Sequence, residues 1–392
     1  MIYFLIVWCV FLLSISFIRA KKNIFSPGVI TSTIWLFLLC LFLVLNHNLP
    51  PLSIQFTSSL FIWITLIVLS SNLILSHKFQ QRKNIEPSKF VRDVYLILSI
   101  IAFPSLIMWI YSTIALGTTG NWALDLRIAT VGEDREMTSF SNALSVLWSV
   151  SFLLELSCFS KRKWYRVAIP ALLCLTLGVF TMARTFIFML FLMTVVMLYF
   201  QKKIRTKQIL IGTATMFFVF FTMQTIRNFG DPSAASIGSF VASYLLSGMA
   251  AFDTLISASS ANFGENVFRI FYAISHSFGL SSIEPIDPIL PFIEEPIVTN
   301  IYTGMYPFFK DFGHIGIAAG ALFYGVLFGW LFKKAQQGSV FYVMCFSYLV
   351  VALIAQFAGE MVFTGFAGHV KFIMLLSIPF IATKYKIFKK RA

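Results

Sequence analysis

Three residues able to take part in acid–base or phosphate chemistry, Lys310, Asp311 and His314, lie within one short segment. They stand where a polar, ring-rich stretch runs into an apolar one, and a charged group there is costly unless it has a partner or a task. His314 could act as a general base because histidine titrates near neutral pH. Asp311 has two interpretations: a second candidate base, or a residue that pairs with Lys310 and caps the following helix.

Three arginines are the candidates for binding phosphate groups: Arg184, Arg227 and Arg269. The planar guanidinium group can hold two phosphate oxygens at once, and Lys310 offers a fourth cation nearby. The alternative for each arginine is a side chain that reaches out to lipid phosphate from a helix end. His276, seven positions after Arg269, is a further candidate general base.

Sugar binding is the third kind of chemistry that the sequence offers. Aromatic rings beside polar groups make platforms for the apolar faces of sugars, and the default alternative is a belt of rings at the membrane interface. The candidate sugar-binding residues are Tyr302, Tyr306, Tyr244 and Arg127.

The elements that must position these residues are membrane helices. Of the 392 residues, 58% are hydrophobic and 12% are charged, and soluble domains carry about twice that charged fraction. Apolar runs of about 20 residues, enough to cross the hydrocarbon core, recur throughout. We expect an all-α polytopic integral membrane protein with eleven transmembrane helices. Their expected limits are 2–18, 29–45, 58–75, 94–116, 140–158, 168–182, 186–200, 209–225, 315–332, 340–357 and 366–381.

Two prolines and two charged residues interrupt these spans. Pro104 and Pro379 are expected to kink their helices, which membrane proteins tolerate. Glu155 and Lys371 each lie near the end of a span, where we expect their side chains to extend to the interface. The glycines Gly313, Gly316 and Gly320 are expected to let the backbone pass close to a neighbour.

The distribution of cations predicts the orientation of the chain. Most of the 30 lysines and arginines fall on one side of the expected spans, which we assign to the cytoplasm. The N-terminus is then outside and the C-terminus cytoplasmic. The net charge of +14 follows from this topology, so a nucleic-acid partner is not expected. The outer side keeps only Arg127, Arg135, Arg184, Arg227, Arg269, Lys310 and Lys371.

The expected organisation has three consecutive regions. Residues 1–225 form an eight-span bundle with an outer loop at 117–139, residues 226–314 form a large outer loop, and residues 315–392 form a three-span bundle. Within the large loop, 236–257 and 266–280 are expected to be helices that lie in the interface or re-enter the membrane. The alternative for 236–257 is a twelfth span, which the charge bias opposes.

The sequence predicts no metal site and no cofactor. The five cysteines lie inside apolar runs, without the spacing of a disulfide framework or a zinc site. Nucleotide-binding loops, nucleophile elbows and zinc-protease motifs do not occur.

Part of the segment that carries Asp311 resembles a known signature. Ile301-Tyr-Thr303, followed by Lys310-Asp-Phe-Gly-His-Ile-Gly316, is similar to the signature of Wzy-type O-antigen and oligosaccharide repeat-unit polymerases. In that family a Tyr-Thr pair precedes an Asp-x-Gly-x-x-Gly sequence at the start of a late span. The large outer loop before it, and an arginine in a tight outer hairpin (here Arg184, preceded by Met182-Ala183 rather than the commoner Gly-Ser), also look like the family.

The resemblance implies an inverting, metal-independent glycosyltransferase of the bacterial cytoplasmic (inner) membrane. It would polymerise undecaprenyl-pyrophosphate-linked repeat units at the outer leaflet, with arginines stabilising the departing pyrophosphate. The implied partners are lipid-linked glycans, membrane lipids, a chain-length regulator and a flippase. We expect Arg184, Arg227 and Arg269 to converge on one outer cavity floored by residues 302–316.

Two alternatives remain at this point. An O-antigen ligase uses similar lipid donors but transfers the glycan to a lipid A core, and it shares the many-span plan with a large outer loop. A polysaccharide flippase or other transporter belongs to a different class, and it predicts ionisable residues deep within several spans. The sequence has almost none at such positions.

Overall fold

The computed structural model describes residues 1–45, 47, 49–76, 85–117, 120, 122–131, 138–180, 184–227, 238, 241–287, 289–295 and 297–389. Within these residues the chain is helical, and the only strand-like pairing there is an isolated bridge between Ile293 and Thr299. An all-α architecture is therefore confirmed for the described part of the chain.

The helices have the length and composition of membrane spans. Six segments in the described residues are long and apolar enough to cross a membrane. They are Ile2–Arg19, Pro27–Val44, Ile54–Leu75, Lys89–Leu116, Tyr306–Gln336 and Phe366–Tyr385. Five shorter apolar helices coincide with the remaining expected spans: Ala143–Ser157, Tyr165–Phe180, Thr185–Phe200, Thr206–Thr222 and Val340–Ile354. A multi-pass membrane protein is the fold class that these helices indicate.

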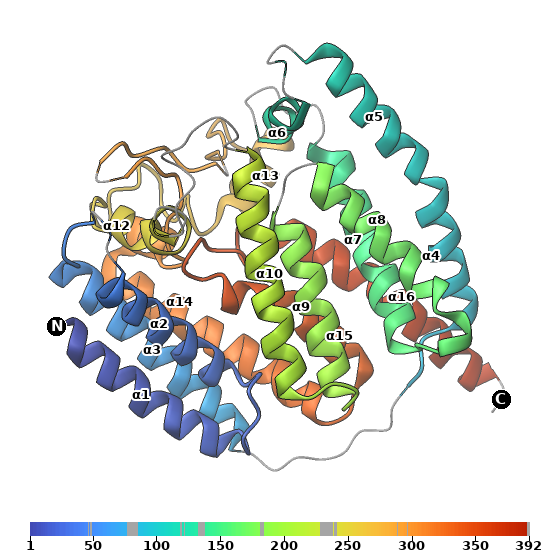
Figure 1. Cartoon of the computed structure of the whole chain (residues 1–392), viewed down its shortest axis with the longest axis horizontal. Coiled ribbons are helices and arrows are strands. Elements are labelled where there is room, and N and C mark those ends of the chain that lie inside the picture. Colours follow the sequence, from blue (N-terminus) through green and yellow to red (C-terminus); the bar gives the residue numbers. More distant parts are fainter. Residues whose placement is uncertain are drawn as a thin grey trace. The chain divides into compact units, whose positions relative to one another are not determined.

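The chain divides into two compact units. Figure 1 shows the helices coloured by their position in the sequence. Unit 1 comprises residues 1–80, 230–334 and 349–366, and unit 2 comprises 81–229, 335–348 and 367–392. This division differs from the three consecutive regions that we expected. The reason is that the long segment after residue 229 folds with the first three helices rather than forming a region of its own.

Unit 1 is built on helices α1 (Ile2–Arg19), α2 (Pro27–Val44) and α3 (Ile54–Leu75), which pack against one another. The long segment adds three short helices and α14. These are the π-helix η3 (Ala242–Leu246), α12 (Ser247–Phe252), α13 (Arg269–Ser277) and α14 (Tyr306–Gln336).

The packing of α14 on α3 depends on glycine. A Cβ atom at Gly325 would lie 2.7 Å from the carbonyl oxygen of Ile67, and one at Gly329 would lie 3.0 Å from the Cα of Ser71. Small residues four positions apart let two membrane helices approach backbone to backbone, and α14 uses that device here. These contacts fix the position of α14 along the axis of α3.

Unit 2 contains the helices between residues 89 and 227 and most of the last helix of the chain. They are α4 (Lys89–Ile101), α5 (Phe103–Leu116), α6 (Trp122–Val131), α7 (Thr138–Ser157), η1 (Lys161–Lys163), α8 (Tyr165–Phe180), α9 (Arg184–Phe200), α10 (Thr206–Arg227) and most of α16 (Phe366–Lys389). Helix α15 (Val340–Ile354) contributes residues to both units.

The two expected proline sites have different outcomes. The span 94–116 is interrupted at Ala102, just before Pro104, and continues as α5, so the interruption there is confirmed. Helix α16 continues through Pro379. Because proline has no N–H, the carbonyl of Leu375 loses its helical donor, and the Tyr95 hydroxyl donates to it at 2.9 Å instead.

Candidate functional site

Helix α14 is interrupted inside the segment that carries Asp311. Gly313 has φ +60° and ψ −145°, a backbone conformation that is essentially restricted to glycine. A Cβ atom at Gly316 would lie 2.1 Å from the carbonyl oxygen of Phe308, so the backbone of the first turns packs directly on this glycine. The expected close approach of backbone is confirmed at Gly316, whereas a Cβ atom at Gly313 would meet only the Cβ of Ser257 at 3.5 Å and one at Gly320 would meet the Phe308 ring at 2.7 Å. The predicted span start at Ile315 falls just after the break.

Asp311 ties α14 to residues 259–267, an earlier part of the same long segment. Its carboxylate is 8% exposed and accepts hydrogen bonds from Ser260 Oγ (2.5 Å), Asn266 Nδ2 (2.7 Å) and the backbone N–H of Val267 (2.8 Å). The backbone N–H of Asn266 donates to the same carboxylate at 3.1 Å. We call these four residues the Asp311 clasp. The donors come from the long segment, so Asp311 has a fastening role there in place of the predicted pairing with Lys310.

Lys310 adds to the same attachment through its backbone. Its carbonyl oxygen accepts hydrogen bonds from the Ser259 N–H at 3.0 Å and from Ser260 Oγ at 3.2 Å. The Lys310 side chain is half-buried. The phosphate-binding role expected of this lysine stays a prediction.

The clasp is followed at once by the helix that carries two candidate residues. Helix α13 begins at Arg269, two positions after Val267, and His276 lies in its last turn. The Nε of half-buried Arg269 donates to the Ile286 carbonyl at 2.6 Å, so the arginine is bound to the loop beyond its own helix. His276 is exposed. The clasp therefore positions the start of α13 and with it Arg269.

His314 lies on the other side of the break at Gly313 and is exposed. Its Nε2 is 3.3 Å from Ser58 Oγ of α3, and its ring centroid is 5.4 Å from that of Phe309. Because its imidazole is exposed, His314 can accept a proton from the hydroxyl of a bound substrate. Asp311 is less suited to this role, because its carboxylate oxygens already accept hydrogen bonds from the protein.

The two tyrosines expected to bind sugars belong to the core. Tyr302 and Tyr306 are 3% and 7% exposed, and their ring centroids are 4.7 Å apart beside Ala251 of α12. The Tyr302 hydroxyl donates to the Pro291 carbonyl at 3.2 Å, and burial raises the pKa of Tyr302. The predicted sugar platform is corrected on this point, because ring faces packed in a core are closed to a ligand. Tyr244, in η3, is half-buried.

The remaining arginines lie in unit 2. Arg184 is the first residue of α9, Arg227 is the last of α10, and Arg127 lies within α6. Their side chains lie outside the described part of the structure. The expected convergence of Arg184, Arg227 and Arg269 therefore stays a prediction.

The segment 236–257 is helical over η3 and α12 in its described part, and its interfacial or re-entrant position stays a prediction. Its described helical part, η3 and α12, has segments of five and six residues, whereas a span needs about 20. All residues of α12 are buried, and a Cβ atom at Gly248 would lie 2.5 Å from the Phe357 carbonyl oxygen. The described helix is thus inserted into unit 1 rather than lying on its surface, because small residues let other backbone segments close over it.

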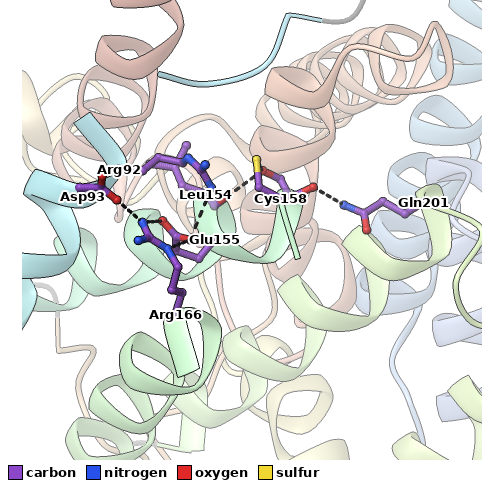
Figure 2. A network of polar contacts seen from close by, with 8 residues as sticks. Arg92, Asp93, Leu154, Glu155, Cys158, Arg166 and Gln201 are labelled. Atoms are coloured by element: carbon purple, nitrogen blue, oxygen red, sulfur yellow. Dashed lines mark hydrogen bonds and ion pairs between the residues drawn. The ribbon is translucent and has the colours of Figure 1, made fainter. Parts of the chain in front are cut away.

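Sequence reasoning missed a cluster of charged residues in unit 2, shown in Figure 2. Arg166 donates from Nε to Glu155 Oε2 at 2.7 Å and from NH2 to Asp93 Oδ1 at 2.5 Å, while Arg92 lies 3.4 Å from the same glutamate. Glu155 is 3% exposed, so it is paired in the interior rather than extended to the interface as predicted. The available signal was that all four residues lie at span ends on one predicted side.

A second missed group is the buried Glu360. Its carboxylate accepts hydrogen bonds from the Tyr324 hydroxyl at 2.5 Å and from the N–H of Val362 at 2.7 Å. The N–H groups of Phe363 and Thr364 donate to it as well, each at 2.9 Å. Glu360 organises the turn between α15 and α16, and its spacing in the sequence carried no sign of this.

No protein-family model, curated protein or solved structure matches this chain. Within the described residues, no group of three His, Cys, Asp or Glu side chains gathers as metal ligands would.

Proposed function

We propose that this protein polymerises undecaprenyl-pyrophosphate-linked oligosaccharide repeat units at the outer leaflet of the bacterial cytoplasmic membrane. The observation that carries the proposal is the Asp311 clasp, by which the residue matching the polymerase signature fastens the segment that bears Arg269 and His276. A signature aspartate with this role explains why the motif and the large loop occur together.

The membrane arrangement in this proposal has eleven spans. The six long helices and the five shorter apolar helices supply them, with the N-terminus outside and the C-terminus in the cytoplasm. The long segment 226–314 then lies at the outer face, where lipid-linked glycans are presented. Arg127 and Tyr244 are the remaining candidates for contact with the sugars.

The proposed reaction is an inverting glycosyl transfer. A hydroxyl of the incoming lipid-linked repeat unit attacks the anomeric carbon of the growing glycan, and the bond from that carbon to the lipid pyrophosphate breaks. The hydroxyl proton passes to a base, for which exposed His314 or His276 is suited. The pyrophosphate leaves with its bonding electrons, and Arg269, Arg184 and Arg227 stabilise the charge that develops.

Arg269 is the described arginine on which the proposal is tested. Its Nε is occupied by the Ile286 carbonyl, which fixes the direction of the guanidinium group. A guanidinium held in place before the substrate arrives stabilises a transition state with little reorganisation. Lysine at this position keeps the charge but loses the fork geometry.

The test is complementation of a deletion strain of the source bacterium, with surface glycan separated by gel. Cells that lack a polymerase display a single repeat unit, whereas cells that lack a ligase or a flippase display no surface glycan. We expect Arg269→Ala to reduce the ladder to one repeat unit, and Arg269→Lys to restore part of it. Arg205→Ala, which alters an exposed arginine, is the control and should leave the ladder unchanged.

Insertion of each variant must be equal by membrane immunoblot. Complete loss of surface glycan in the deletion strain would exclude polymerisation and favour the ligase or the flippase. A normal ladder from Arg269→Ala would remove this arginine from the proposed site.

A further inference from the structure

One face of unit 2 carries a cleft lined by cations. Lys89, Arg92, Lys163 and Arg166 line it together with Glu155 and Ser160. The cleft lies where α4 begins, α7 ends and α8 begins, and these three helices pack against one another. Figure 2 shows the side chains of Arg166 and Arg92 directed at Glu155.

The charges of this cleft are unequal. The two carboxylates, Glu155 and Asp93, are both engaged by Arg166, and Arg92 shares only Glu155 with it. The Arg92 Nε is buried and has no hydrogen-bond partner within the described residues. Lys89 and Lys163 are exposed at the mouth. The cleft therefore has positive charge beyond what its own carboxylates neutralise, and Glu155, at 3% exposure, is screened from the mouth.

The surroundings of the cleft have the character of a membrane interface. Trp164 and Tyr165, beside Lys163, are 64% and 46% exposed, and rings of this kind collect at the level of lipid headgroups. Two of the helices that form the cleft also expose apolar side chains: Leu172 of α8 is 61% exposed, and Ile97 of α4 is 56% exposed. Apolar side chains of this exposure provide a surface for acyl chains below a headgroup.

We propose that this cleft binds the phosphate headgroup of an anionic membrane phospholipid. Lys89 and Lys163 attract the phosphate at the mouth, and the guanidinium of Arg92 is positioned to donate to it from within. Arg166 is held by Glu155 and Asp93, and Arg92 is held by Glu155. Basic pockets between membrane helices are a common form of lipid recognition, and this one is independent of the proposed polymerase reaction.

The experiment measures binding to the purified full chain in neutral detergent, with phosphatidylglycerol as the probe and phosphatidylcholine as the zwitterionic reference. Native mass spectrometry across a lipid titration gives the apparent affinity. We expect tighter binding of phosphatidylglycerol, and roughly thirtyfold weaker binding in the Lys89→Ala/Lys163→Ala double variant, since each lysine near an anionic surface contributes to attraction. Both side chains are exposed, so the fold should be retained.

The matched control is the Lys207→Ala/Lys384→Ala variant, which removes the same charge from two exposed positions outside the cleft. It should bind phosphatidylglycerol as the unaltered chain does. Equal loss in both double variants would overturn the proposal, because general electrostatic attraction would then explain the binding. Displacement of the lipid by millimolar inorganic phosphate would also overturn it, since the cleft would then be a site for a soluble anion.

Discussion

Two buried carboxylates in the two units are stabilised in opposite ways. Glu155 in unit 2 is bound by the guanidinium groups of Arg166 and Arg92, whereas Asp311 in unit 1 is bound by hydroxyl, amide and backbone N–H groups. The first arrangement joins three helices and lies beside two further cations, Lys89 and Lys163. The second keeps the negative charge and uses it to hold a loop. The donors around a buried carboxylate thus decide its role: with arginine donors it positions cations, and with neutral donors it holds a loop.

The largest expected effect comes from removing the acid of the first arrangement. Glu155→Ala leaves two guanidinium groups in the interior without their shared carboxylate, and breaking a buried ion pair in this way costs about 3–5 kcal/mol. Equilibrium unfolding in detergent measures the loss of unfolding free energy. The control is Glu86→Ala, which removes an exposed glutamate of the same unit and should change stability little. A loss no larger than that of the control would mean that the cluster does not stabilise unit 2.

Removing the charge of the second arrangement should have a smaller and more local effect. Asp311→Asn places an amide against donor groups, and leaving one or two of them unpaired costs about 1–3 kcal/mol. Hydrogen–deuterium exchange should rise in residues 260–277 and remain unchanged in α1. Glu294→Gln, a change of equal charge at an exposed position, is the control. Unaltered exchange in residues 260–277 would show that the clasp is not what holds this segment.

The break beside Asp311 gives a third comparison. Gly313→Ala forces a Cβ atom into a glycine conformation and costs about 1–3 kcal/mol. Gly368→Ala, in helix α16, meets no atom within 4 Å and has no left-handed backbone, so it should be neutral or stabilising. The difference between the two melting temperatures measures the cost of the break. Equal melting temperatures would mean that α14 can straighten at little cost.

The smallest effect concerns a third carboxylate, Asp253, which accepts hydrogen bonds from Ser53 Oγ and from the Ser53 N–H at 3.1 Å. Burial raises the pKa of Asp253 above its ordinary 3.8, and the bonds from Ser53 oppose that rise. The folded state therefore binds the proton more tightly than the unfolded state does. This contribution to stability is complete below pH 3.8 and is lost as the pH rises through the folded pKa.

A pH series of unfolding midpoints tests this expectation. Asp253→Asn should flatten the decline in stability between pH 3.8 and the raised pKa while leaving the remaining pH dependence of the chain unchanged. A decline of the same slope in the variant would assign the effect to another group.

Local patterns in the sequence were enough to predict the helices, the interruption before Pro104 and the close approach at Gly316. Each of these depends on residues a few positions apart. The partners of Asp311 lie 44 to 51 positions earlier, and a local pattern does not show which distant residues meet, so their contact with it could not be predicted. Buried and interfacial rings have the same residue types, and this is why Tyr302 and Tyr306 were assigned to ligand binding rather than to the core.

The glycine break in α14 also has a mechanical consequence. A continuous helix transmits tension through its ladder of hydrogen bonds, and a residue at φ +60° and ψ −145° interrupts that ladder. Force applied to the chain just before residue 313 is therefore shared with residues 260–267 through the Asp311 clasp.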